Sequence, residues 1–472
     1  MCASEPSPEP RHGLALLLLL FVPLRLMSLV WYQPLHVEVA TFQFPFAYLQ
    51  HHGLYPFFDY WLEHPPVLVY HFLGLAAAAR GLLGAGSVAW QAACFVRAVQ
   101  VSAVVWETGS LALIHRVVRR LRGERQALWA CWVYIALFAT GFVSASYLDN
   151  FPAFLLLAGV ALIAHGRLMW SAMVLGIGFM TKVFPAALLP VLAKGTARWP
   201  RRVLAGGAFA VVVGLTAAPF VVRDRPWLRC GLECTMRRPP WETVWALLEG
   251  QYEFGYVGPQ PSAFDPAYMR KCGVTDEQWR RLLDLPPSVY LRGAPEAKEG
   301  QTNADVNRAL LARHPRFRVA FYGVASHFAT DLHFIGPPMK RPWLYAAAGV
   351  AFALFYVWVF ARLPAELSPE RRVLFAAFTV LLFFLYSKGW SPQFVAYVIP
   401  LFLIVFPTGE AVLWCLLLSV TAFLEMPVWA VYVHGRPGLA ALDRVLLQVA
   451  VLGRTAILAV TLGRIYRRLL RK

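Results

Sequence analysis

Long apolar runs recur along the chain from residue 13 to residue 463, and they constrain its fold more than any other feature. A helix needs roughly 20 apolar residues to cross a bilayer. The candidate stretches are 13–33, 92–115, 126–145, 150–165, 168–181, 183–194, 202–222, 342–362, 371–387, 393–407, 411–433 and 444–463. Several are short, so some must be tilted, broken or packed inside a bundle. We therefore predict an all-α polytopic membrane protein with about twelve transmembrane helices.

The composition agrees with a membrane protein and removes the usual meaning of a high positive charge. Hydrophobic residues make up 58% of the chain and charged residues 15%, against roughly 45–50% and ~25% in soluble domains. A net charge of +18 would suggest a nucleic-acid partner in a soluble protein. Here the basic residues stand in short clusters beside apolar runs, where they orient helices. We predict a multi-pass protein of the plasma membrane in contact with lipid, with no nucleic-acid partner.

The positions of the basic clusters predict which loops face the cytoplasm. Arginine and lysine gather in four places, and the positive-inside rule puts all of them in the cytoplasm: 116–125, 194–202, 362–372 and 464–472. If the apolar run 66–86 also crossed the membrane, the first of these clusters would be forced outside. We therefore expect 66–86 to stay on the outer side, as an interfacial or partly inserted helix. Residues 34–91 and 223–340 then form two large outer loops.

On this topology, polar residues gather at the outer ends of several helices. One turn carries Asp149 and the next carries Lys182, while the stretch "YSKGWSPQF" carries three polar residues, Lys388, Ser391 and Gln393. Ionisable groups at such positions are costly and are candidates for function. The lysines suggest an anion site such as a phosphate leaving group. The alternative is that these are solvated loop charges, or that the Lys388 stem reaches the headgroups.

The first outer loop contains the acidic and aromatic stretch "DYWLEHPP". It holds Asp59, Glu63 and His64, and Glu38 lies earlier in the same loop. A carboxylate can remove the proton from an attacking hydroxyl. Pro65 biases His64 away from helix, so an extended segment should end here and a helix should begin. Glu63 could also be a plain helix-terminus carboxylate favoured by the dipole, and both roles are compatible.

Three motifs give the chain a family resemblance. They are "GLYPFFDYWLEHPPVLVYHF", "TKVFPAALLPVL" and "YSKGWSPQFVAYVIPLF", and "RRPPWETVWALLEGQY" looks like a loop of related members. In these motifs the chain resembles the GT-C superfamily of integral membrane glycosyltransferases, and within it the bacterial polyprenyl-phosphate-mannose-dependent mannosyltransferases. His64 stands where that family usually has Tyr. The resemblance implies a conserved transmembrane module at 1–222 that includes the outer loop 34–91. A large outer loop at 223–340 and C-terminal transmembrane helices at 341–472 would follow.

The resemblance also implies roles for individual residues. The family keeps an acidic base after the first helix, and here that role is open between Glu38 and Asp59. The polar residues at the outer helix ends and the motifs of the resemblance together give the residues expected at the substrates: Glu63, His64, Asp149, Lys182, Lys388, Ser391, Gln393 and Trp241. No cofactor is implied, because neither a nucleotide-binding fingerprint nor a pattern of metal ligands is present.

The function that follows is an inverting transfer of a sugar, with mannose expected. The donor would be a polyprenyl-phosphate-linked sugar, and the acceptor a hydroxyl of a lipid or glycan on the outer face of the membrane. Two alternatives stay open. A transporter or lipid flippase would also explain charges within the membrane, but it predicts helices broken near the midplane and needs no large outer loops. A non-catalytic assembly protein of the cell envelope is the other.

Overall fold

The computed structural model describes residues 13–31, 50, 55–58, 64–84, 88–221, 239–252, 275–277 and 339–471. Apart from isolated β-bridge positions, the regular structure in these residues is helical. Elements of the N-terminal part are α1 (Gly13–Trp31), α3 (Pro66–Leu83), α4 (Val88–Arg122), α5 (Glu124–Ala136), α6 (Phe138–Ser146), α7 (Asn150–Ala164), α8 (Leu168–Phe179), η2 (Phe184–Leu188), α9 (Leu189–Ala193) and α10 (Trp199–Val221). Elements that follow are α12 (Val244–Glu249), α17 (Pro342–Arg362), α18 (Pro369–Tyr386), η4 (Pro392–Phe394), α19 (Val395–Val405), α20 (Thr408–Phe423), η5 (Leu424–Val433) and α21 (Ala440–Leu470).

Each of the twelve predicted apolar stretches contains helix within its described residues, but the helices differ in length. Within the described residues, six helices are long and apolar enough to cross a membrane, or seven if the bent pair α5–α6 counts as one span. That pair turns by 58° at its break. Five further apolar helices are shorter, among them α7, α8 and the segment Pro392–Val405. Short and broken helices are tolerated at membrane depth where protein surrounds them. The described residues are thus nearly all helical, and the chain is a multi-pass membrane protein, as predicted.

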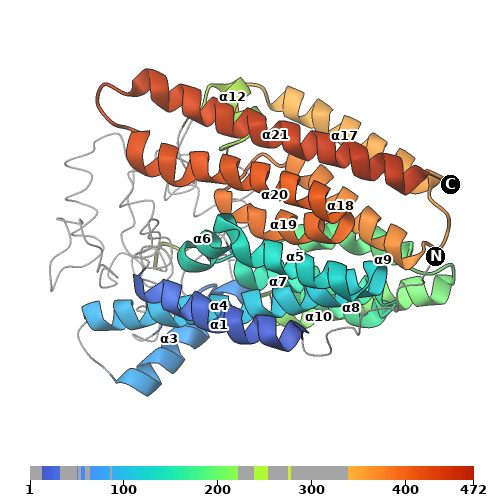
Figure 1. Cartoon of the computed structure of the whole chain (residues 1–472), viewed down its shortest axis with the longest axis horizontal. Helices are drawn as coiled ribbons and strands as arrows, with labels where there is room; N and C mark the ends of the chain where they lie inside the picture. The colour runs from blue at the N-terminus through green and yellow to red at the C-terminus, as the bar shows by residue number, and fades with distance from the viewer. Residues whose placement is uncertain are drawn as a thin grey trace, which may run out of the picture.

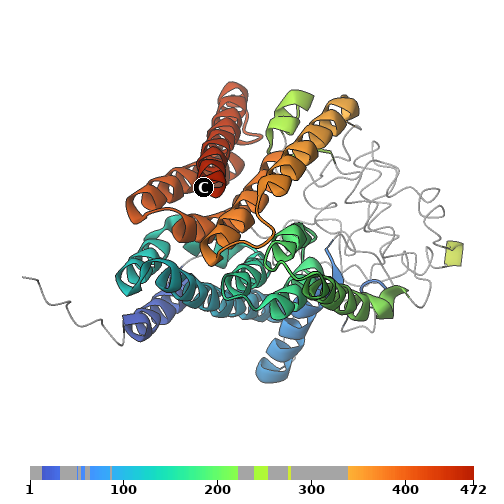
Figure 2. The same ribbon diagram turned by 90° about the vertical axis from the view of Figure 1, so that its right-hand side faces the viewer.

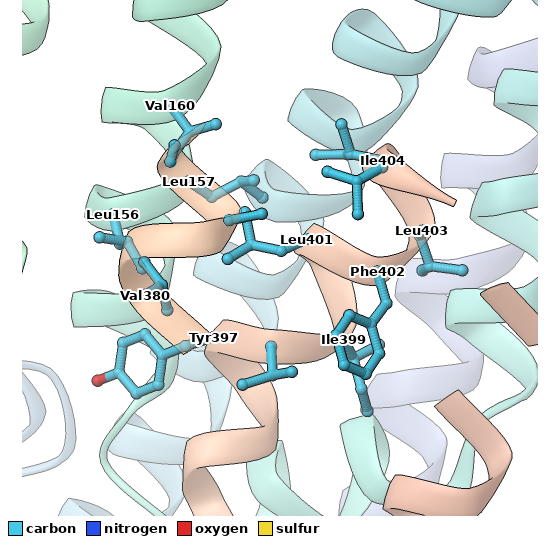
Figure 3. Packing of buried hydrophobic residues seen from close by; sticks show 14 of the residues in the cluster. Leu156, Leu157, Val160, Val380, Tyr397, Ile399, Leu401, Phe402, Leu403 and Ile404 are labelled. Carbon is cyan, nitrogen blue, oxygen red and sulfur yellow. The ribbon is translucent and has the colours of Figure 1, made fainter. Parts of the chain in front are cut away.

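Helix α19 lies at the centre of the bundle because its sequence, "VAYVIPLFLIV", is apolar on every side. All of its residues are buried, as expected for a helix without a polar face. It packs against α7 and α18, and Figure 3 shows side chains of these three helices, such as Leu157, Val380 and Leu401, filling the space between them. Helices α7 and α18 also pack against each other. They join the N-terminal group of helices to the C-terminal group, and the two groups lie side by side in Figure 1.

Two apolar helices lie at the periphery instead. In α17 only Val359 is buried, and in α10 only Ala205 and Phe220. Both sequences are as apolar as a buried helix would be, so water cannot be the solvent of their outer faces. These faces are the surfaces that lipid would cover, and Figure 2 shows α17 on the outside of the bundle.

All four predicted basic clusters lie at one end of the bundle, and this end faces the viewer in Figure 2. Arg122 donates to the carbonyl oxygens of Leu403, Ile404 and Phe406 at the end of α19, and Arg468 donates to Val405 beside them. The Lys194 ammonium donates to the Leu363 carbonyl at 2.8 Å. Cations at helix C-termini satisfy carbonyls that have no partner within the helix. The arginines therefore bind helix ends together as well as carrying the charge bias.

Helix α3 begins at the opposite end and is itself one of the six helices that are long and apolar enough to cross a membrane, so the placement of 66–86 on the outer side stays a prediction. Val67 N–H donates to the Met180 carbonyl at 3.0 Å, after α8. His71 Nε2 lies 3.2 Å from Ser102 Oγ, about 30 Å along α4 from Arg122 at 1.5 Å per residue. From there α3 runs outward against the first turns of α4, where Arg80 and Gln91 line the same small cavity. In Figure 1 it lies far from the C-terminus.

Candidate functional site

Asp149 is the centre of a buried polar cluster at the end of the bundle away from the basic residues. It lies between α6 and α7 with a relative exposure of 1%. Its side chain does not cap α7. Instead, Oδ1 accepts a hydrogen bond from Tyr397 Oη at 2.6 Å and lies 2.5 Å from Lys182 Nζ. Residues from α19 and from the turn after α8 therefore meet at one carboxylate.

Lys182 is the part of this cluster that reaches toward solvent. The chain turns after α8, where Lys182 N–H donates to the Gly178 carbonyl at 2.9 Å, and Pro185 then lies in the first turn of η2. The Lys182 side chain keeps a relative exposure of 15%, and its ammonium lies 4.9 Å from the centre of the Phe394 ring. A charge that is paired on one side and open on the other can still bind an anion.

Several buried polar atoms around Asp149 lack hydrogen-bond partners among the described residues. They are Asp149 Oδ2, Asn150 Nδ2, Gln393 Oε1 and Ser146 Oγ. A buried donor or acceptor without a partner is costly, and native structures keep few of them. Both donors and acceptors are present in this set. A ligand with hydroxyl groups, each of which donates and accepts, would satisfy them.

The stretch 387–391 precedes η4 and is covered by a segment from the second predicted outer loop. Trp241 N–H donates to the Lys388 carbonyl at 3.0 Å, and Trp390 N–H donates to the Trp241 carbonyl at 3.2 Å. The Trp241 indole lies so close to Gly389 that a Cβ atom there would be 2.0 Å from it. Only glycine fits under this ring. The predicted residues Trp241 and Lys388 are thus brought together through their backbones.

A second buried polar cluster stands behind this turn. Arg454 in α21 is ion-paired with Glu425 in η5, and its other terminal nitrogen donates to the Glu242 carbonyl. The guanidinium carbon lies 4.5 Å from the centre of the Trp390 ring. Trp390 in turn packs edge-on against Phe394 at 5.6 Å between ring centres. Because Lys182 lies over Phe394, the two aromatic rings connect the two polar clusters.

The remaining predicted residues are only partly placed. Ser391 is half-buried, and its carbonyl accepts from Phe394 N–H at 2.9 Å. His64 precedes Pro65, which is extended with ψ 154°, and α3 begins at Pro66, as predicted. The hydrogen bond from Val67 to Met180 sets this start beside the Lys182 turn. Glu38, Asp59 and Glu63 lie outside the described residues.

Four residues of the site did not follow from sequence reasoning. Tyr397, Glu425 and Arg454 lie inside predicted spans, and Glu242 lies in a predicted loop. For Glu425 and Arg454 a signal was present, because a charged residue within an apolar run marks a buried partner or a site. Tyr397 carried no such signal. Among the described residues, no three His, Cys, Asp or Glu side chains gather as a metal site would require.

Comparison with known proteins yields one sequence relative over part of the chain. No family model matches. Over 165 residues the chain is 32% identical to the undecaprenyl phosphate-alpha-4-amino-4-deoxy-L-arabinose arabinosyl transferase of Pseudomonas paraeruginosa. The alignment covers 31% of this chain and 30% of that protein. The chain therefore matches less than a third of the length of this relative.

Solved structures give a likeness over nearly the whole chain at low similarity. The oligosaccharyltransferase of Archaeoglobus fulgidus in the apo form aligns with 96% of this chain and 56% of its own, at 12% identity and a TM-score of 0.42. ArnT from Cupriavidus metallidurans, also in the apo state, aligns with 95% of this chain and 76% of its own, at 15% identity and a TM-score of 0.35. These scores are too low for the likeness to support an argument about fold or function.

Proposed function

We propose that the chain is a membrane glycosyltransferase of the GT-C type, which moves a sugar from a polyprenyl-phosphate donor to an acceptor hydroxyl. The observation that carries the proposal is the Asp149–Lys182 pair. In it, a lysine whose side chain is 15% exposed lies beside buried polar atoms that have no partners among the described residues. The motif resemblance supports the proposal. So does the partial identity to an arabinosyl transferase whose name includes undecaprenyl phosphate.

The cluster suits the leaving-group side of such a reaction. The acceptor oxygen would form a bond to the anomeric carbon while the bond from that carbon to the phosphate oxygen breaks. Negative charge grows on the departing lipid phosphate, and a cation fixed beforehand stabilises that charge most when it has developed. Lys182 is fixed in this way, because Asp149 and the Phe394 ring hold its ammonium in place. The acceptor proton would go to a carboxylate, for which Glu38 and Asp59 are the candidates.

The transferred sugar and the side of the membrane belong to the proposal as well. The motifs favour mannose, whereas the sequence relative is named for an amino-deoxy-arabinose. We keep mannose as the first sugar to test and the aminoarabinose as the second. The site lies opposite the basic end of the bundle, which supports a site on the outer face with a lipid or glycan acceptor.

The transporter alternative also has an observation in its favour. The bend of 58° between α5 and α6, and the non-helical residue Met426 within the α20–η5 span, are interruptions of the kind that transporters use. A transporter of the same donor would bind the same sugar hydroxyls and phosphate, so the binding groups alone do not separate the two functions. The alternatives differ in the fate of the donor, because a transporter leaves it intact.

The proposal is tested by transfer of labelled sugar in nanodiscs. Purified protein is given polyprenyl-phosphate mannose or the aminoarabinose analogue, with membrane lipids and glycans as acceptors. We expect label in the acceptor with the wild-type protein and a loss of at least about 100-fold with Lys182→Met, as for removal of one group that stabilises the developing charge. Lys340→Met is the matched control, since that side chain is exposed. Equal activity of both variants would reject the role of Lys182.

A further inference from the structure

Residues 239–252, which we call the arm, lie against the bundle although they belong to the second predicted outer loop. Glu249 accepts the backbone N–H groups of Lys340 and Arg341 at 2.5 and 2.9 Å, which holds the end of α12. Tyr252 Oη accepts from Gln448 of α21 at 3.3 Å. Figure 1 shows α12 beside α21. The C-terminal end of the arm is therefore held against α21 and the start of α17.

At its N-terminal end, beside the turn before η4, the arm is held in an unfavourable backbone conformation. Glu242 has φ +49°, which is uncommon for a residue with a side chain, and it is 1% exposed. Such residues persist only where the surroundings hold them, and they cluster at functional sites. Here Arg454 donates to the Glu242 carbonyl and is ion-paired with Glu425. Thr243 Oγ1 donates to the Lys388 carbonyl at 3.3 Å.

Arg454 contacts both sides of the junction between the arm and the turn before η4. One face of its guanidinium stacks on Trp390, which belongs to the turn before η4, and its nitrogens bind Glu425 and the arm. Trp390 packs against Phe394, over which the Lys182 ammonium lies. A continuous set of contacts thus runs from Arg454 to the Asp149–Lys182 pair.

The cost of burying these charges indicates a role other than stability. Arg454 and Glu425 are 3% and 0% exposed. Replacing a buried ion pair by apolar side chains of similar size is often neutral or stabilising, so such a pair is weak evidence for stability alone. The better-attested use is to fix one arrangement among several. The arrangement fixed here is the contact between the arm and the η4 turn.

We infer that Arg454 is a positioning residue that fastens the arm to the η4 turn and so sets the shape of the donor site beside Lys182. The docking of the arm stands on the contacts alone. Its effect on the donor rests on the proposed function. With Arg454 in place, Trp390 is fixed from both sides, and Phe394 is fixed through it. Without Arg454, the Glu242 carbonyl loses its side-chain donor and Trp390 loses the cation that lies over its ring.

Hydrogen exchange measured by mass spectrometry tests the docking without any assay of activity. The amides of Trp241 and Trp390 are bonded across the junction, so their exchange reports its opening. We expect Arg454→Met to speed exchange in peptides that cover 239–243 and 388–391 by about tenfold or more, since each tenfold change corresponds to about 1.4 kcal/mol of opening free energy. Arg454→Lys should give an intermediate exchange rate, because lysine keeps the positive charge that pairs with Glu425 but lacks the several N–H donors of the planar guanidinium.

Two further variants keep the test decisive if Arg454→Met does not fold. Thr243→Val removes the hydroxyl that donates to the Lys388 carbonyl and that accepts the Ala246 N–H at the start of α12, with no buried charge left over, and should speed exchange in the same peptides to a smaller extent. Arg464→Met, on the same helix but half-exposed and paired with Glu410, is the control that should leave them unchanged. Wild-type exchange rates in both Arg454→Met and Thr243→Val, or in Thr243→Val alone if the other is unfolded, would overturn the inference.

Kinetics separate this inference from the proposed function. If transfer is observed, Arg454→Met and Thr243→Val should raise the KM for the donor more than they lower kcat, because they disturb the shape of the site and leave the reacting groups in place. Faster exchange with an unchanged donor KM would contradict the coupling to the site. If the wild-type protein transfers no sugar, the proposed function fails, and the exchange result still decides the docking.

Discussion

Lys182 Nζ lies 2.5 Å from Asp149 Oδ1, and this contact joins the turn after α8 to the turn before α7. Tyr397 donates to the same oxygen from α19, the most buried helix of the bundle. The position of the ammonium is therefore set by three elements at once. A cation held in this way needs little rearrangement when it binds an anion, which is the property that a leaving-group site requires.

The pair predicts an asymmetric effect on stability. Lys182→Met leaves the Asp149 carboxylate buried beside a single hydroxyl donor, and we expect a loss of about 3 kcal/mol in the free energy of unfolding, as for other broken buried pairs. Adding Asp149→Asn should recover most of that loss, because no charge is then left without a partner. Denaturant unfolding in detergent would measure both. A double variant as unstable as Lys182→Met would contradict the ion-pair account, and sugar transfer should stay lost in either case.

Arg122 predicts a stabilising role for the basic end. Its guanidinium donates to Leu403, Ile404 and Phe406, so Arg122→Met should lower the free energy of unfolding by about 2 kcal/mol, as expected when charged donors to buried carbonyls are lost. Arg119→Met is the matched control, since Arg119 is 64% exposed and its pairing with Glu124 is worth little at the surface. If Arg122→Met and Arg119→Met unfolded at similar temperatures, Arg122 would contribute only to the charge bias that orients the helices.

The basic clusters at one end of the bundle and the arm at the other predict the topology in the membrane. In a background without native cysteines, Leu248→Cys in α12 should react with a membrane-impermeant maleimide in intact cells, since Leu248 is 48% exposed on the arm. Arg119→Cys at the basic end should react only after permeabilisation. The opposite labelling pattern would place the candidate site in the cytoplasm and exclude an acceptor on the outer face.

The base is predicted to be a carboxylate of the first outer loop. Either Glu38→Gln or Asp59→Asn should reduce transfer by ~10²–10⁴-fold, because the amide has nearly the same shape but cannot accept the proton. Glu366→Gln, at the basic end and half-exposed, provides a control in which a carboxylate is lost far from the site. Wild-type turnover in both loop variants would exclude both residues as the base.

The sequence predicted the positions of the helices and the two ends of the bundle because these depend on local properties. Apolar runs mark the helices and arginines mark their ends, and the four basic clusters do lie together. The turns with Asp149 and Lys182 were expected at one end, and the structure joins them. The half-length helices were expected only in general terms, because an apolar run does not reveal whether protein or lipid surrounds it.

The partners of the site residues could not be predicted from the sequence. Tyr397 meets Asp149, and Arg454 meets Glu242, across more than two hundred residues of chain. Such contacts depend on how helices pack, which hydrophobic periodicity does not specify. Glu425 and Arg454 stood out as charges in apolar runs, so their burial as a pair was open to prediction, whereas the contact with the arm was not.

A doubly labelled donor gives the most direct test of the central claim. Polyprenyl-phosphate sugar with one isotope in the sugar and another in the phosphate is incorporated, together with acceptor, into proteoliposomes that contain the purified protein. Sugar transfer predicts that the labels separate, with the sugar in the acceptor and the phosphate on the lipid, and that Lys182→Met prevents the separation. If the labels stayed together on the donor for every sugar tested, while the intact donor crossed the bilayer, the protein would be a transporter.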